Sequence, residues 1–387
     1  MVGKKVVIKL GGSVLREPKD FDLMAKKVRR ELELGNRVIL VVSAMKGETD
    51  RLIQLGREVG ANDELLDSIA GLGEVLSARL MAASLNRLGI KAAAIDPSSP
   101  LWPIYTDDRF GDANVDLHKT CGSAISNLEP LLKEAVPVVC GYLGKSRDGK
   151  LTTLGRGGSD TTAVVLARCL KADEVVLVKD SPGVLTADPK VMKDAKRLKE
   201  LDASEALLVS LGGAKVLHHK ALKYLTPKIR LRVVSADEEG FTSGGTVVKG
   251  YIPPLEVEVH PRKVSMITLV LRERIPHNFK DSISISYLDN AAIVYVDSNV
   301  EKVLKEAHKL VDEGKVKAVT LKDGLAMIKV WGAAIEEIPG IVSKITEPLA
   351  EKGINIFGVQ TVHNRVAIFV DWDKKEEVAE HLKSVLA

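Results

Sequence analysis

The most informative segment of the sequence is rich in glycine and leads into a predicted helix at 163–170. It reads Thr152-Thr153-Leu154-Gly155-Arg156-Gly157-Gly158-Ser159-Asp160-Thr161-Thr162. Its three glycines let the backbone approach a ligand closely, and ordering so flexible a segment is unfavourable unless something binds there. Arg156 and Asp160 bracket the adjacent glycines, which an ordinary turn does not require. The segment therefore predicts an anion-binding loop at the start of a helix.

Two other segments place glycine after a predicted strand. The first is Ile8-Lys9-Leu10-Gly11-Gly12-Ser13, where backbone N–H groups and the Lys9 ammonium favour a phosphate. The second is the loop 179–189, which contains Pro182-Gly183 and is placed to frame a nucleotide. No G-x-x-x-x-G-K-[ST] pattern and no complete G-x-G-x-x-G after a strand occurs, so a P-loop ATPase, a protein kinase and a Rossmann dehydrogenase are poorly supported.

The first 235 residues or so alternate short β-branched runs with longer helical patterns, which predicts an α/β fold: an αβα sandwich with a mostly parallel sheet. The expected strands are 6–10, 38–42, 91–95, 136–140, 175–178 and 231–234. The expected helices include 21–34, a long one at 63–88 that is broken near Gly71-Leu72-Gly73, and 204–223.

The pattern changes after Pro253-Pro254, which reads as a linker. We expect two small α+β units of similar plan beyond it. The first contains strand 264–271, a hairpin of 282–288 and 291–296, helix 300–313 and strand 316–321. The second contains strand 325–331, a helix from Ile338-Pro339 to Gly353, strands 354–359 and 365–370, and helix 375–386.

Composition excludes several classes of protein. The 387 residues carry 56 Lys and Arg against 52 Asp and Glu, a balance that argues against a nucleic-acid partner. No uninterrupted apolar run is long enough for a membrane span, and the N-terminus does not resemble a signal peptide. Cys121, Cys140 and Cys169 are odd in number and far apart, which predicts reduced thiols, with Cys140 and Cys169 as small buried side chains. We expect a soluble, cytoplasmic protein.

Five segments in order resemble the amino-acid kinase family, and within it the aspartate kinases (aspartokinases), over nearly the whole chain. They match the family's opening Lys-Phe-Gly-Gly-Thr-Ser, its Val-Ser-Ala-x-x-Gly-x-Thr, Gly-Glu-x-x-Ser-Ala and Gly-Arg-Gly-Gly-Ser-Asp-x-Thr-Ala elements, and its Gly-Ala-Lys-Val-Leu-His element. The matching segments are Lys9–Ser13, Val42–Asp50, Gly73–Ala78, Gly155–Ala163 and Gly213–His218. Ile338-Pro339-Gly340 and Gly353-Ile354-Asn355-Ile356 resemble the ACT domains of these enzymes.

The resemblance implies a catalytic domain at 1–250, a truncated first ACT-like unit at 251–322 and a second ACT unit at 323–387. It implies transfer of a phosphoryl group from ATP, with Mg²⁺, to the side-chain carboxylate of L-aspartate, the first step of lysine, threonine and methionine biosynthesis. Lys9 and Asp160 are the implied catalytic residues, with Asp160 orienting Lys9 or a Mg²⁺ ion. The implied substrate-binding residues are Ser43, Thr49, Glu74, Tyr142, Arg156 and Ser159. The implied ATP-binding residues are Lys9, Gly11, Gly12, Ser13, Lys179, Asp180, Gly183, Leu185, Lys190 and Lys215.

The sequence also departs from the family. The opening is one residue shorter, and Lys179-Asp180 stands where relatives carry Thr-Asp. Between strand 264–271 and the hairpin, the stretch 273–282 is too short for the usual ACT helix, so a feedback site for lysine or threonine stays open. Two alternatives remain: a kinase acting on another amino acid such as homoserine, and a non-catalytic amino-acid sensor. ACT units commonly pair side by side, so we expect a homodimer or a higher homo-oligomer with an amino-acid effector at these units. His218-His219 is expected at a partly exposed helix end, with no metal role.

Overall fold

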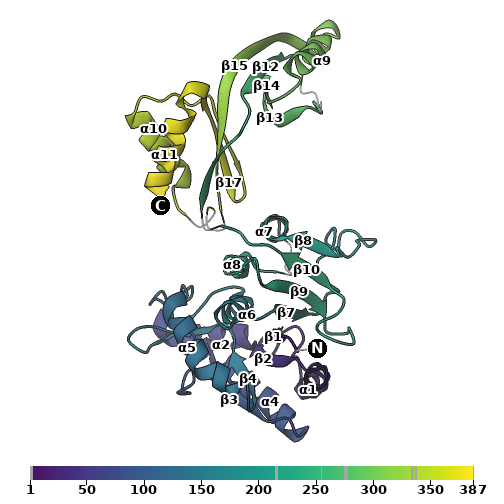
Figure 1. Ribbon diagram of the computed structural model, residues 1–387, viewed down its shortest axis with the longest axis vertical. Helices are drawn as coiled ribbons and strands as arrows, with labels where there is room; N and C mark the ends of the chain where they lie inside the picture. The colour runs from purple at the N-terminus through teal and green to yellow at the C-terminus, as the bar shows by residue number, and fades with distance from the viewer. Residues whose placement is uncertain are drawn as a thin grey trace. The chain divides into compact units, whose positions relative to one another are not determined.

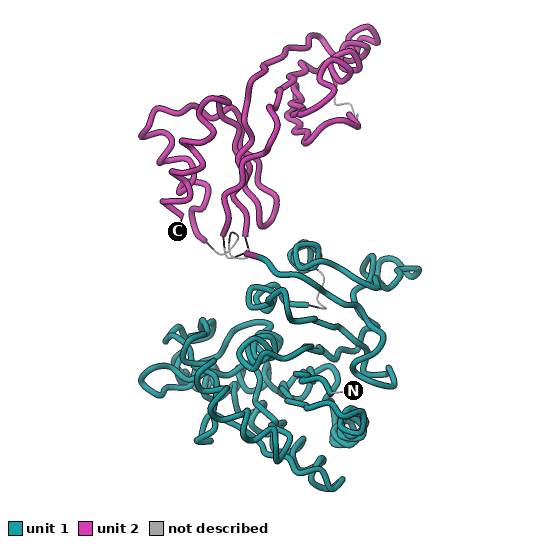
Figure 2. The backbone as a smooth tube through the Cα atoms, in the orientation of Figure 1, with its two compact units in different colours: residues 1–252 teal, residues 253–387 magenta. Residues whose placement is uncertain are grey.

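The computed structural model describes residues 3–213, 217–253, 255–273, 278–332, 335 and 338–386. The chain divides into two compact units, residues 1–252 and residues 253–387 (Figure 2).

The first unit is built on an eight-stranded sheet with the order β3-β4-β2-β1-β7-β9-β10-β8 (Figure 1). Every pair in it is parallel except β9 with β10. All residues of β1 and β4 are buried, because helices cover both faces, and this explains their uninterrupted apolar sequence. The strands are β1 (Lys5–Leu10), β2 (Arg37–Val42), β3 (Ala92–Ile95), β4 (Val136–Cys140), β7 (Glu174–Lys179), β8 (Glu200–Asp202), β9 (Arg230–Ser235) and β10 (Thr246–Lys249).

Helices form the two outer layers of this unit, which confirms the predicted αβα sandwich. One layer places α4 against β2, β3 and β4 with α1 beside it, and the other places α6 against β1, β2 and β7 with α5 and α8 beside it. The helices are α1 (Pro18–Glu33), α2 (Glu48–Glu58), α3 (Asp63–Ala70), α4 (Leu72–Arg87), α5 (Leu117–Leu131), α6 (Gly158–Cys169), α7 (Ala203–Leu211) and α8 (His219–Leu222). A small hairpin of β5 (Leu143–Lys145) and β6 (Leu151–Thr153) precedes α6.

The helix expected at 63–88 is interrupted at Gly71, which separates α3 from α4, as the glycines at 71 and 73 predict. Among the described residues, the run Asp63–Arg87 is one helical stretch with the length and composition to cross a membrane. The buried core helix of a globular domain meets the same criterion, and half of its most apolar window is buried inside the unit.

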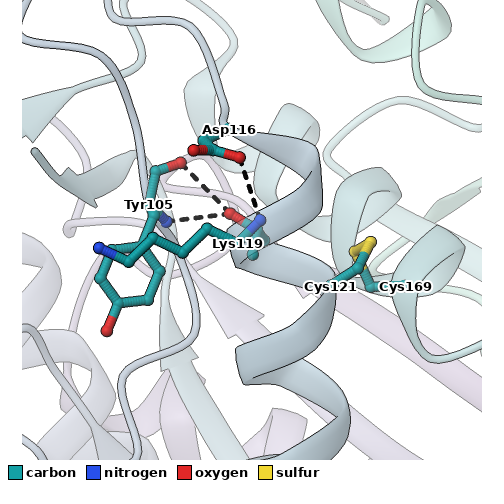
Figure 3. The surroundings of a disulfide bond; sticks show 6 residues. Tyr105, Asp116, Lys119, Cys121 and Cys169 are labelled. Carbon is teal, nitrogen blue, oxygen red and sulfur yellow. Dashed lines mark hydrogen bonds between the residues drawn. A yellow bond between two sulfur atoms is a disulfide. The ribbon is translucent and has the colours of Figure 1, made fainter. Parts of the chain in front are cut away.

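The expectation that all three cysteines are reduced is wrong, because Cys121 and Cys169 form a disulfide. Helices α5 and α6 lie side by side, so residues 48 positions apart come to a Cα–Cα distance of 4.5 Å. Figure 3 shows the bond beside the start of α5, where the carboxylate of Asp116 accepts the backbone N–H of Lys119 and caps the helix. Cys140 is a free, buried thiol, as predicted. Spacing along the chain cannot reveal this pairing, since it depends on how two helices pack.

The second unit is an antiparallel sheet with helices on it. Its strand order is β13-β14-β12-β15-β17-β16, and β11 pairs with β15. The strands are β11 (Glu256–Val259), β12 (Val264–Leu271), β13 (Ser282–Leu288), β14 (Ala291–Val296), β15 (Val316–Trp331), β16 (Gly358–Val362) and β17 (Arg365–Asp371). The helices are α9 (Val300–Asp312), α10 (Ile341–Glu351) and α11 (Lys375–Leu386). One buried apolar cluster joins α9 to β12 and β14, and another joins α10 and α11 to β15 and β17.

Strand β15 links the two halves of this sheet. The strands expected at 316–321 and 325–331 are one continuous strand, whose first half pairs with β12 and whose second half pairs with β17 and β11. Each half of the sheet thus has four strands, and the fourth strand of the second half is β11, which precedes the first half in the chain. The pairing of β11 with the second half of the sheet could not be anticipated from the sequence.

Candidate active site

The candidate site lies where the central parallel strands end. Strands β4, β2, β1 and β7 are neighbours running in one direction, so their carboxyl ends meet at one edge of the sheet. Lys9 lies near the end of β1, Ser43 directly follows β2, Tyr142 follows β4, and Lys179 ends β7. A cleft of about 980 Å³ opens at this edge and is lined by all four residues.

Two lysines share one carboxylate at the bottom of the cleft. Asp160, in the first turn of α6, accepts Lys9 Nζ at Oδ1 over 2.7 Å and Lys179 Nζ at Oδ2 over 2.8 Å. The side chains of Lys9, Asp160 and Lys179 are 7%, 4% and 14% exposed. The group is therefore a nearly dry cluster with one more positive than negative charge. Of the two roles considered for Asp160, the geometry shows the orientation of Lys9.

Burial and charge shift the pKa values of this cluster in opposite directions. Burial lowers the pKa of Lys9 to about 8, and the nearby Lys179 ammonium lowers it too, against the attraction of Asp160. For Asp160, burial alone favours the neutral acid, but the ammonium groups of Lys179 and Lys9 outweigh it and hold its pKa well below the usual range. Asp160 is therefore ionised at neutral pH, and Lys9 is mostly protonated.

Glu74 supplies a second buried carboxyl group to the lining of the cleft, in the first turn of α4. Its Oε1 accepts the backbone N–H of Ala44 at 3.2 Å, and its Oε2 is buried without a hydrogen bond among the described residues. Burial raises the pKa of Glu74 to about 7, although the Ala44 N–H and the charge of Lys9 lower it in part. A buried carboxylate with an unused acceptor atom suits a cationic group of a ligand.

Two glycines in the loops around the cleft leave no room for a side chain. A Cβ on Gly12 would lie 2.7 Å from the carbonyl oxygen of Ala44, so this glycine lets the loop after β1 pack onto the segment after β2. Gly157 has a φ of +71° at the N-cap of α6, and a Cβ there would lie 2.2 Å from Cγ of His218. The loop Gly155–Gly158 is thus fixed between the end of β6 and the start of α8.

Most of the predicted site residues gather here. Tyr142 adopts a left-handed backbone at φ 70°, which bulky residues rarely do, and its N–H donates to Thr162 Oγ1 at 3.2 Å. Arg156 lies exposed on the loop before α6, while Ser159 is buried at its start. The cleft is lined by the following predicted residues: Lys9, Gly12, Ser13, Ser43, Thr49, Glu74, Tyr142, Arg156, Ser159, Asp160 and Lys179.

The remaining predicted ATP-binding residues do not line this cleft. Gly11 lies next to it, since a Cβ there would be 3.2 Å from Lys9 Nζ. Asp180, Gly183, Leu185 and Lys190 lie on the loop after β7, where Leu185 bridges to Arg197 and Val184 N–H donates to Thr246 Oγ1. Lys215 lies outside the described residues.

The sequence analysis missed several lining residues. His218 is a partly exposed helix end, as expected, and caps α8, but it also lines the cleft, which was not expected. Burial, followed by the neighbouring His219, lowers the pKa of His218 to about 4. Lys46, Asp50 and Arg57 also line the cleft, at its exposed side. The one sequence signal for His218 was its place at the end of the matching segment Gly213–His218, and the structure adds that a Cβ on Gly157 would meet its ring.

Comparison with known proteins identifies the family. The amino acid kinase family model matches residues 4–235, and an ACT domain model matches residues 320–384. The first match spans more than half of the chain, so the chain belongs to the amino acid kinase family.

Similar proteins cover almost the whole chain. The sequence is 29% identical over 390 residues to an aspartokinase of Geobacillus stearothermophilus, which covers 95% of this chain and 93% of that protein. It is 36% identical over 249 residues to an aspartokinase of Rickettsia bellii, covering 61% and 59%. Among solved structures, aspartokinase III of E. coli with aspartate and ADP matches 99% of this chain and 100% of its own, with a TM-score of 0.60 and 24% identity. The aspartate kinase from Synechocystis has a TM-score of 0.77 at 24% identity, covering 99% of this chain and 70% of its own. These structures share the fold.

Proposed function

We propose that the chain is an aspartate kinase, which transfers the γ-phosphoryl group of ATP to the side-chain carboxylate of L-aspartate and yields L-4-aspartyl phosphate and ADP. The observation that carries this proposal is the buried Lys9–Asp160–Lys179 cluster, which lines one cleft together with Glu74. Support comes from relatives named aspartokinase that align over nearly their whole length, and from a structure of one with aspartate and ADP.

The reaction needs positioning and charge more than covalent help. A carboxylate oxygen of the acceptor attacks the γ-phosphorus, and the bond from that phosphorus to the β,γ-bridging oxygen breaks, leaving its electron pair on ADP. No proton has to be removed, because the attacking group is already ionised. Lys9, held by Asp160 at 2.7 Å, neutralises charge on the transferred group, and Gly11 and Gly12 supply backbone donors.

We assign the acceptor's other groups to further residues that line the cleft. Glu74 holds the α-ammonium group with its unused Oε2, and Arg156 offers a planar fork for the α-carboxylate. Ser43, Thr49, Tyr142 and Ser159 complete the amino-acid pocket. We assign ATP to the side of Lys179 and the loop after β7, with Ser13, Asp180, Gly183, Leu185 and Lys190 as its contacts. Lys215, which the resemblance also assigns to ATP, lies outside the described residues.

Mg²⁺ fits this site only together with the nucleotide. The described residues contain no group of three or more His, Cys, Asp or Glu side chains arranged for a metal. Asp160 is already engaged by two ammonium groups, whereas Asp180 is exposed at the end of β7. Mg²⁺ usually binds through one or two carboxylates plus substrate phosphates, and Asp180 is the carboxylate that would hold it here. When bound, the ion would offset charge on the phosphates.

The activity is tested with purified protein, ATP, Mg²⁺ and L-aspartate, trapping the acyl phosphate with hydroxylamine. We expect hydroxamate and ADP in equal amounts, and no product with Lys9→Ala. L-Homoserine and L-glutamate, tested by ADP release, serve as competing acceptors. Folded protein that releases ADP with homoserine but forms no hydroxamate with aspartate would contradict the proposal.

The second unit has a proposed regulatory role. We assign residues 1–250 to catalysis, and residues 251–322 and 323–387 to two ACT-type units, the first of which carries helix α9. A solved structure of E. coli aspartokinase III holds lysine together with aspartate. An amino-acid effector at the ACT-type units, a homodimer or higher homo-oligomer, a cytoplasmic location and a role in lysine and threonine biosynthesis follow from the proposed function.

A further inference from the structure

The Lys9–Asp160–Lys179 cluster contains one cation more than its carboxylate requires. Lys9 alone, at 2.7 Å, would neutralise Asp160. Lys179 lies 2.8 Å from one oxygen of the same carboxylate and 3.2 Å from the other. Among the described residues, no second acidic side chain forms an ion pair with either lysine. The cluster therefore holds, in an almost dry place, one positive charge more than the carboxylate it shares. Glu74, whose pKa the charge of Lys9 lowers, is the other buried carboxyl group of the cleft, and among the described residues it forms no ion pair with either lysine.

A purely structural role accounts poorly for that charge. Burying an ammonium is unfavourable unless its charge is balanced, and placing it beside another ammonium adds repulsion. A fold that needed only to hold Asp160 would have an uncharged residue at 179. An anion entering the cleft would balance the charge.

The position of Lys179 in the fold indicates which anion would balance this charge. It ends β7, the strand that pairs with β1, and it directly follows the pair Leu10 and Val178. Its ammonium contacts Asp160 in the first turn of α6, the same carboxylate that Lys9 contacts from the end of β1, just before the glycines at 11 and 12. The positive end of the twelve-residue helix α6 points to the same place and adds to the field.

We propose that Lys179 binds the transferred phosphoryl group directly, as a second catalytic cation beside Lys9. The inference rests on the proposed phosphoryl transfer but not on the identity of the acceptor. As the bond between the γ-phosphorus and the bridging oxygen lengthens, negative charge accumulates on the phosphoryl oxygens and on the leaving oxygen of ADP. Lys9 and Lys179, held apart by the two oxygens of Asp160, contact this group from two sides.

The direct test compares two nucleotides in the Mg²⁺ form: ADP, and the ATP analogue in which an NH group replaces the β,γ-bridging oxygen. Calorimetry on the full-length protein measures both affinities for Lys179→Met. We expect the affinity for the analogue to fall about tenfold to a hundredfold, as for loss of a charged hydrogen bond, and that for ADP to change less than about threefold. Lys199→Met removes an exposed lysine after the same loop and should change neither affinity.

Kinetics supply a second readout. Lys179→Met should lower kcat about 10²- to 10³-fold with little change in the KM for the acceptor, and Lys179→Arg should restore part of the rate because its charge can still reach the phosphoryl group.

Equal losses of affinity for ADP and for the analogue would overturn the proposal, since Lys179 would then bind the rest of the nucleotide. An unchanged kcat in Lys179→Met would show that Lys179 is only a counter-ion of Asp160, and this result would also overturn the proposal. If the methionine variant does not fold, Lys179→Arg and Lys179→Gln give the same comparison, and analogue binding by folded Lys179→Gln at wild-type affinity would refute it. If the wild-type protein binds neither nucleotide, the kinase function itself is wrong.

Discussion

At the scale of single residues, Glu74 couples acceptor binding to pH. Its pKa of about 7 means that the carboxyl is about half ionised near neutrality, and only the ionised form attracts an α-ammonium group. We therefore expect the KM for L-aspartate to fall as the pH rises from 6 to 8. Glu74→Gln should raise this KM by roughly a hundredfold, since a charged hydrogen bond is lost, and should abolish its change between pH 6 and 8. An unaltered pH profile in the variant would exclude Glu74 as the ammonium partner.

The raised pKa of Glu74 also makes the stability of the fold depend on pH. The pKa of Glu74 is raised from 4.5 to about 7 in the folded chain, so folding favours the protonated acid. The contribution of Glu74 to the free energy of unfolding is fully present below about pH 4.5. It is lost as the pH rises through 7, and the total loss is roughly 3 kcal/mol. Glu74→Gln removes this dependence, so at pH 8.5 the variant should be more stable than the wild type by a similar amount. Denaturant unfolding of both proteins at pH 5 and pH 8.5 measures the difference, and equal midpoints at both pH values would contradict it.

The grouping of candidate residues could be anticipated where chemistry is visible in the sequence, while their roles stay predictions. Lys9, Glu74 and Asp160 lie beside glycines at strand ends or helix starts, and the structure places all three on one cleft. His218 was missed because its role depends on the approach of α8 to the loop at Gly157. The link between Lys179 and Asp160 was equally invisible, since it joins side chains from a strand end and a helix start 19 residues apart.

At the scale of elements, the turn into α6 has a steric requirement that a single substitution can test. Gly157→Ala places a Cβ against the His218 ring at a residue whose φ is positive. Gly149→Ala is the control, because Gly149 also has a positive φ, +81°, but an added Cβ there would have no neighbouring heavy atom within 4 Å. Gly149→Ala should destabilise the protein by about 1 kcal/mol. Gly157→Ala should destabilise it by about 2 kcal/mol or more and should reduce kcat by at least about tenfold, because Ser159 and Asp160 shift with the loop. Thermal unfolding and the hydroxamate assay measure both variants, and equal behaviour would refute the steric account.

The disulfide between α5 and α6 gives a second prediction at this scale. Closing a loop of 48 residues restricts the unfolded chain, so reduction should lower the free energy of unfolding by about 2 to 4 kcal/mol. Alkylation of unreduced, denatured protein followed by mass spectrometry should label Cys140 alone, and all three cysteines should be labelled after reduction. Cys121→Ser combined with Cys169→Ser should have the stability of the reduced wild type. Labelling of all three thiols without reductant would show that the bond is absent.

Most elements could be predicted from the sequence, and the pairings between distant elements could not. The runs at 264–271, 282–288 and 291–296 became β12, β13 and β14 with the expected bounds, because period and turn residues are local signals. Strand β11 has the short sequence Glu256–Val259, and its partner in β15 lies some 70 residues later. Nothing local distinguishes a linker from a strand whose partner is so far away.

At the scale of the whole molecule, the open question is assembly. Val359 and Val362 on β16, which ends the strand order of this sheet, are 41% and 60% exposed. Gln360 Nε2 of the same strand donates to Ser286 Oγ of β13, the strand at the other end of that order. A terminal strand with exposed apolar side chains is normally covered, and a second copy of the chain would cover it. We therefore expect light scattering to give about twice the 41.9 kDa of one chain.

A pair of charge substitutions locates the contact. Val359→Lys with Val362→Lys should shift the mass towards one chain by placing like charges across the two-fold contact. Val191→Lys makes the same kind of change at a valine that is 86% exposed in the other unit, and should leave the mass unchanged. A dimer that survives the double substitution would show that another surface pairs, and a monomeric wild type at micromolar concentration would reject pairing altogether. If the dimer is lost while hydroxamate formation persists, the catalytic cleft is complete within one chain, as its lining from β1, β2, β4, β7, α4 and α6 of a single unit leads us to expect.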